Sequence, residues 1–114
     1  GHNDVVVVGD AGLPVPAGVP CIDLALMRGL PSMAQVLEAL ESEMQVERMV
    51  LAKETFFANQ GELPGWLPPV WRDLPIEQVA HEVFKQRNAQ ARAVIRTGEY
   101  TPFSNVMLVA GVAF

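Results

Sequence analysis

The sequence predicts an α/β fold, in which residues 1–114 form a single layered domain with a central, mostly parallel or mixed sheet flanked by helices. Short apolar runs at 5–8, 46–52 and 93–97 have the composition of buried strands. An amphipathic helical pattern at 33–44 separates the first two runs, which gives a strand–helix–strand order. The length of 114 residues is that of one ordinary domain.

The first strand is predicted from the four consecutive valines at 5–8. Their branched side chains suit a pleated sheet, and their unbroken apolarity indicates burial on both faces of that sheet. The next four residues, Gly9-Asp10-Ala11-Gly12, form a flexible turn. Residues 22–26 then form either a short strand or irregular structure.

The clearest helix begins at Ser32, where a serine followed three residues later by Gln35 resembles a capping box. Apolar residues follow at helical spacing: Met33, Val36, Leu37, Leu40 and Met44. This spacing predicts one helix face packed on the core. The run at 46–52 is the next buried strand.

The segment 53–73 mixes aromatic residues with glycines and prolines, which excludes a long regular helix. It is either a compact packed segment with one or two helical turns or a patch that a neighbouring subunit covers. The remaining elements are a strand at 76–79, a helix at 80–89, and strands at 93–97 and 105–110.

Composition and charge exclude several classes of partner. The eight Lys and Arg residues are scattered and the net charge is −5, so no nucleic acid or anionic membrane surface is expected. No apolar run reaches the roughly 20 residues that span a bilayer.

One cysteine, Cys21, excludes an internal disulfide and fits the cytoplasm; we interpret it as a small buried side chain. The His, Cys and acidic residues lack the spacing of metal ligands.

Two histidines, His2 and His81, are the candidates for proton transfer. Imidazole has a pKa of about 6.5, so it can donate or accept a proton near neutral pH. For His2 the alternative is a remnant of an expression tag or a frayed terminus, and the pattern does not choose between the two. For His81 the simpler interpretation, a solvated residue in the first turn of a helix, is favoured by the pattern alone.

Asp10 and the triplet Phe103-Ser104-Asn105 are the candidates for ligand binding. Asp10 follows a buried strand, where α/β domains often place ligands, although an Asx turn is an equal alternative. The triplet combines an aromatic ring with a hydroxyl and an amide, groups that can pack on a sugar and bond to its hydroxyls. Its alternative is an ordinary turn before a strand.

Nine blocks in order along the chain resemble the D-ribose pyranase family: 1–4, 10–16, 22–26, 29–32, 43–47, 81–85, 93–99, 101–105 and 110–114. The resemblance implies that His2 is the proton donor. It implies sugar-binding roles for Asp10, His81, Lys85, Phe103, Ser104 and Asn105. Compared with the family pattern, we expect residues 1–114 to lack the N-terminal helix, and Phe103 stands where the family has tyrosine.

The resemblance further implies an intramolecular isomerase that interconverts the pyranose and furanose forms of D-ribose without a cofactor or metal. Ring opening and reclosure would proceed by general acid–base catalysis. The family assembles as ring-based homo-oligomers with clefts between subunits, which agrees with a hydrophobic share of 50% and a charged share of 18%. Two alternatives are a mutarotase for another sugar, such as fucose, and a sugar-binding module without catalytic activity.

Overall fold

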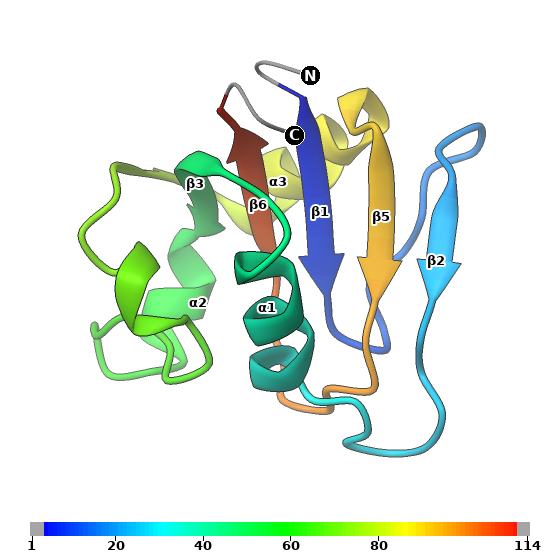
Figure 1. Ribbon diagram of the computed structural model, residues 1–114, viewed down its shortest axis with the longest axis horizontal. Coiled ribbons are helices and arrows are strands. Elements are labelled where there is room, and N and C mark those ends of the chain that lie inside the picture. Colours follow the sequence, from blue (N-terminus) through cyan, green and yellow to red (C-terminus); the bar gives the residue numbers. More distant parts are fainter. Residues whose placement is uncertain (1–3, 112–114) are drawn as a thin grey trace.

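The computed structural model describes residues 4–111 as one six-stranded sheet with helices on both faces (Figure 1). The strands are β1 (Val5–Gly9), β2 (Cys21–Asp23), β3 (Val46–Ala52), β4 (Ile76–Val79), β5 (Ala93–Arg96) and β6 (Val106–Ala110). The helices are α1 (Met33–Glu41), α2 (Lys53–Phe57) and α3 (His81–Arg87), with 3-10 turns at Pro69–Trp71 and Asn88–Gln90. The predicted α/β class is confirmed.

The sheet is mixed because one central strand runs against its neighbours. The strand order is β2-β5-β1-β6-β3-β4. β6 is antiparallel to both β1 and β3, while the pairs β1–β5, β2–β5 and β3–β4 are parallel. The carboxyl ends of the five other strands therefore share one edge of the sheet with the start of β6. We call this the carboxyl edge; it lies where Gly9 ends β1 and Val106 begins β6.

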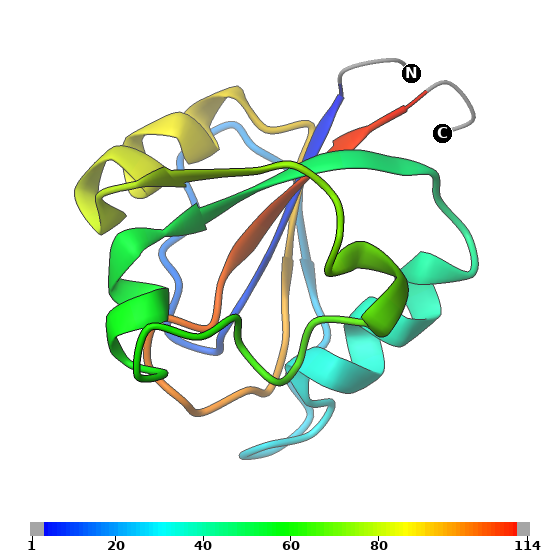
Figure 2. The ribbon, with the colours of Figure 1, turned by 90° about the vertical axis from the view of Figure 1, so that its left-hand side faces the viewer.

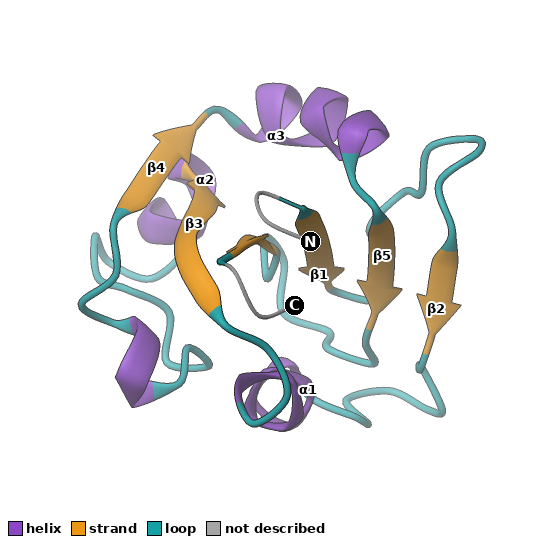
Figure 3. Cartoon of the chain, turned by 45° about the horizontal axis from the view of Figure 1, so that its top comes forward, coloured by secondary structure: helices purple, strands orange, loops and turns teal. Residues whose placement is uncertain are grey.

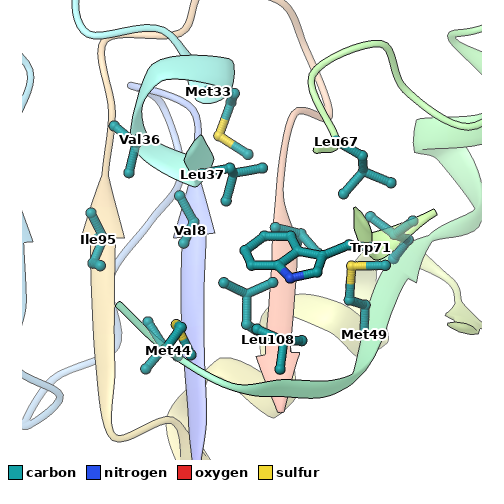
Figure 4. Close-up of a cluster of buried hydrophobic side chains, with 14 residues drawn as sticks. Val8, Met33, Val36, Leu37, Met44, Met49, Leu67, Trp71, Ile95 and Leu108 are labelled. Atoms are coloured by element: carbon teal, nitrogen blue, oxygen red, sulfur yellow. The ribbon is translucent and has the colours of Figure 1, made fainter. Parts of the chain in front are cut away.

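Two hydrophobic cores lie on opposite faces of the sheet, as the valine run predicted. Val6 and Val8 face the core beneath α1, whereas Val7 faces the core that contains Phe84 of α3. Figure 3 shows α1 and α3 on opposite sides of the strands, and Figure 2 gives a nearly edge-on view of the same layers. In the first core, Trp71 and Leu108 pack near α1 (Figure 4).

The capping box that predicted α1 is present. The backbone N–H of Gln35 donates to Ser32 Oγ at 3.1 Å, and the backbone N–H of Ser32 donates to Gln35 Oε1 at 2.8 Å. These two bonds satisfy donors that a helix start leaves unpaired. The helix ends at Glu41, so Met44 lies beyond it but is still buried in the core.

The segment 53–73 has the helical turns and buried side chains of the first alternative predicted for it. It contains α2 and one 3-10 turn, and it buries Trp71 and Leu67 in the core. The same segment leaves Phe57 82% and Val70 62% exposed. Packing within the chain therefore covers only part of its apolar surface.

One expectation about the edge of the sheet is wrong. Cys21 is exposed rather than buried, because it begins β2, an edge strand whose three residues are all exposed. The next residue of this strand, Ile22, is 51% exposed despite its apolar side chain. No helix within residues 4–111 is long and apolar enough to cross a membrane.

Candidate active site

Three segments that are distant in sequence meet at the carboxyl edge. Asp10 follows β1, His81 follows β4, and Phe103 and Asn105 lie just before β6. These four side chains line a cavity of about 250 Å³ together with Gly12, Leu13, Pro14 and Pro102. The sheet topology brings them together, because parallel strands place their carboxyl ends on one side.

Asp10 is held by backbone donors on both sides of the cavity. Its Oδ1 accepts a hydrogen bond from Gly12 N–H at 2.9 Å, which forms the Asx turn that was one of the two alternatives. The backbone N–H of Ser104 also donates to this carboxylate. Burial raises the pKa of Asp10, and these two hydrogen bonds oppose that rise in part.

Asn105 connects the loop before β6 to the end of β1. Its Oδ1 accepts a hydrogen bond from the backbone N–H of Asp10 at 3.0 Å, and the residue is 1% exposed. Because the oxygen is engaged, the Nδ2 group is the end of the amide that can serve a ligand. No hydrogen bond within residues 4–111 uses this Nδ2.

His81 is the first residue of α3, and its imidazole ring lies at the cavity wall. Its ring meets Phe103 edge to face, with centroids 5.0 Å apart and planes at 87°. Its Nδ1 is buried and has no hydrogen-bond partner among the described residues. A buried polar atom without a partner is unfavourable by about 1–3 kcal/mol, so the packing around this ring must offset that cost.

Phe103 has an unusual backbone conformation with φ of 61°. This left-handed region costs an L-residue about 1–2 kcal/mol, so the surroundings must hold it there. Its carbonyl accepts a hydrogen bond from Thr55 Oγ1 at 2.7 Å. The ring thereby lies at the cavity wall beside His81.

Of the other sequence-predicted residues, Lys85 and Ser104 do not place a side chain in this cavity. The Lys85 ammonium pairs with Glu82 Oε1 at 2.9 Å, one turn along α3. Ser104 is 2% exposed and contributes its backbone N–H to Asp10. His2 lies outside the described residues.

A second cavity, of about 350 Å³, extends the site and shares Asp10, Gly12 and Pro102 with the first. Tyr100 lies on its rim, and the Arg28 guanidinium stacks 3.5 Å from the centre of that ring. A larger cavity of about 380 Å³ lies between α1 and residues 65–70 and shares no lining residue with the other two. Within residues 4–111, no three His, Cys, Asp or Glu side chains cluster as a metal site.

Two residues that support the site were missed from the sequence. The backbone N–H of His81 donates to Glu54 Oε1 at 2.9 Å, and Thr55 bonds to Phe103. Both lie in α2, immediately after β3. Their position at the carboxyl end of a strand was the signal that could have singled them out.

Similar proteins have closely related sequences over the whole chain. A D-ribose pyranase of Paracidovorax citrulli is 52% identical over 116 residues, covering 100% of this chain and 86% of the relative. A D-ribose pyranase of Bacillus licheniformis is 46% identical over 114 residues, with the same coverage. The structure of Bacillus subtilis RbsD complexed with D-ribose superposes with a TM-score of 0.91 at 46% identity, covering 100% of this chain and 86% of that one.

A more distant relative shares the fold. The fucose mutarotase of Streptococcus pneumoniae, solved in complex with L-fucose, has a TM-score of 0.71 at 17% identity and covers 100% of this chain and 86% of that one. The model of the RbsD / FucU transport protein family matches residues 1–113. With the site and fold described above, this match shows that the chain belongs to the RbsD / FucU family.

Proposed function

We propose that this protein is an isomerase that interconverts the pyranose and furanose forms of D-ribose. One observation carries the proposal: Asp10, His81 and Asn105 converge on one cavity at the carboxyl edge, each with a polar group that can reach a ligand. The identity of about 50% to D-ribose pyranases along the full chain supports ribose as the sugar.

The cavity contains the groups that a small polyhydroxyl ligand requires. The Asp10 carboxylate accepts hydrogen bonds from sugar hydroxyls, and Asn105 Nδ2 donates them. The imidazole of His81 supplies a further bond, while the Phe103 ring packs against a C–H face. A volume of about 250 Å³ lies just below the range of drug-sized pockets and suits one small sugar.

The reaction needs one proton to leave and another to arrive. As the bond between the anomeric carbon and the ring oxygen breaks, the anomeric hydroxyl loses its proton and the ring oxygen gains one, which gives the open aldehyde. Attack of a different hydroxyl on the aldehyde closes the other ring. We assign the proton donor to His2 and the orientation of the hydroxyls to Asp10, His81 and Asn105.

Saturation transfer between the NMR signals of ribose pyranose and furanose tests the proposal directly. The protein at catalytic concentration is expected to raise the exchange rate above that in buffer. The same assay with fucose examines the alternative substrate, for which the structural likeness shows only the fold. Ribose-induced shifts of protein signals without faster exchange would instead indicate a sugar-binding module.

We also propose a ring-based homo-oligomer with the cleft between subunits. The exposed loop after β2 carries Leu26 and Met27, which are 75% and 64% exposed, and its Arg28 stacks on Tyr100 at the rim of the site. A neighbouring subunit on this loop would bury apolar surface and close the open side of the cavity. Sedimentation equilibrium measures the assembly, and a monomer at micromolar concentration would contradict it.

The exposed thiol of Cys21 fits a reducing compartment, and we propose the cytoplasm.

Ribose affinity is expected to weaken as the pH falls. This loss should begin at a higher pH than it would if the aspartate were exposed. Burial raises the pKa of Asp10, and only the ionised carboxylate accepts bonds with both oxygens, so protonation as pH falls through this raised pKa weakens binding. NMR titrations with ribose across a pH series locate this acid limb. Asp10→Asn is expected to bind weakly at every pH and to lack the limb; an unchanged limb in this variant would assign it to another group.

A further inference from the structure

Two consecutive residues of α2 each bond to the backbone of a residue that lines the cavity. Glu54 accepts the backbone N–H of His81 through Oε1 at 2.9 Å. Thr55 donates its hydroxyl to the carbonyl of Phe103 at 2.7 Å. Neither side chain lines the 250 Å³ cavity, although Thr55 lines a smaller cavity of about 100 Å³ that shares Pro102 and Phe103 with it.

The bond from Thr55 matters because of the conformation that it holds. Phe103 has a φ of 61°, which an aromatic L-residue keeps only when its surroundings impose it. Thr55 is 4% exposed, so water competes little for its hydroxyl. Among the described residues, this hydroxyl is the only hydrogen-bond donor to the Phe103 carbonyl.

The bond from Glu54 fixes the start of α3. Ala80, the N-cap residue of this helix, provides no side-chain hydrogen bond, so the carboxylate of Glu54 replaces a local cap from a distant element. A negative charge at a helix N-terminus is also favoured by the helix dipole. The bond therefore fixes the backbone from which the His81 ring projects.

The two bonds act on a single ring pair. In the sequence, His81 precedes β5 and Phe103 follows it. Their rings nevertheless meet edge to face, with centroids 5.0 Å apart. Glu54 and Thr55 are joined by one peptide bond and follow β3 directly. Two adjacent residues at the end of β3 therefore bond to the backbones of the two residues whose rings meet.

We infer that Glu54 and Thr55 are positioning residues that hold His81 and Phe103 together at the sugar cavity. The predicted effect on ribose binding rests on the proposed function. The predicted movement of the ring pair does not. The arrangement predicts that loss of either bond moves the ring pair and weakens ribose binding. It predicts no loss when the replacement residue keeps the hydrogen bond.

The test compares Thr55→Val, which loses the hydroxyl at nearly the same shape, with Thr55→Ser, which keeps it. In Thr55→Val the ring-proton signals of His81 are expected to shift, because the ring current of Phe103 changes with distance. The Kd for ribose is expected to rise about 3- to 10-fold, the effect of one hydrogen bond. Thr55→Ser is expected to retain the wild-type His81 signals and the wild-type Kd.

Glu54 gives a second, independent pair that remains informative if Thr55→Val does not fold. Glu54→Ala removes the acceptor for the His81 N–H, whereas Glu54→Gln keeps an acceptor oxygen. Only Glu54→Ala is expected to shift the His81 signals and to weaken ribose binding. Lys53→Ala, at an exposed position of the same helix, controls for general effects on α2.

Unchanged His81 signals and ribose affinity in both Thr55→Val and Glu54→Ala would overturn the inference. Equal damage from Thr55→Ser and Thr55→Val would also overturn it, because bulk rather than the hydrogen bond would then matter. Failure of the proposed function gives a different result: wild-type protein would not accelerate ribose exchange, while the His81 signals would still report on the ring pair.

Discussion

Replacing His2 with alanine is expected to slow ribose ring exchange at saturating sugar by about 10²- to 10⁴-fold, the range that one positioned acid or base supplies. An imidazole with a pKa of about 6.5 can both give up and take back a proton near neutral pH. Alanine can do neither. Saturation-transfer NMR measures the exchange rate, and chemical-shift titration measures ribose binding in the same samples.

The two readouts separate a proton donor from a binding residue. His2→Ala is expected to keep ribose affinity close to that of the wild type while exchange slows. His81→Ala, which removes a ring from the cavity wall, is expected to raise the Kd for ribose. Wild-type exchange in His2→Ala would assign the donor role to another residue.

Gly9→Ala is expected to disrupt both the fold and the site. A Cβ at this position would lie 2.7 Å from Asn105 Oδ1 and would also press on the side chain of Leu13. Asn105 would have to move, and its bond to the backbone of Asp10 would be lost. Overpacking of this kind lowers the free energy of unfolding by about 1–3 kcal/mol, and displacement of Asn105 should also weaken ribose binding.

Gly65→Ala is the matched control, because a Cβ there meets nothing within 4 Å. Urea denaturation and ribose titration on both variants separate crowding at β1 from a general effect of glycine replacement. If Gly9→Ala retained wild-type stability and affinity, the tight contact between Gly9 and Asn105 would have no role in the site.

The elements of the fold were largely predictable because their signals are local. The valine run at 5–8 became β1, the run at 46–52 became β3 with the same bounds, and the capping box at Ser32 starts α1. The strand order was not predictable, since it depends on pairings such as Val8 with Val106 between residues distant in sequence. The exposure of Cys21 follows from that order, because β2 lies at the edge.

The site was partly predictable for a related reason. Asp10, His81, Phe103 and Asn105 carry functional groups that sequence can suggest, and all four line one cavity. Glu54 and Thr55 were missed because they act on the backbone of other residues, and only the folded chain shows which backbone groups lie within reach. The ion pair of Lys85 with Glu82, in contrast, was open to prediction, because oppositely charged residues three positions apart lie on one side of a helix.

The position of β6 makes the completeness of the site depend on the completeness of the sheet. β6 is the last of the described strands, yet it lies at the centre of the sheet and is the only strand that pairs with both β1 and β3. Without β6, the strand pairings of the sheet leave two separate groups, β2-β5-β1 and β3-β4, with no strand pairing between them. The loop before β6 carries Phe103 and Asn105, so the segment that joins the two groups of strands also completes the cavity.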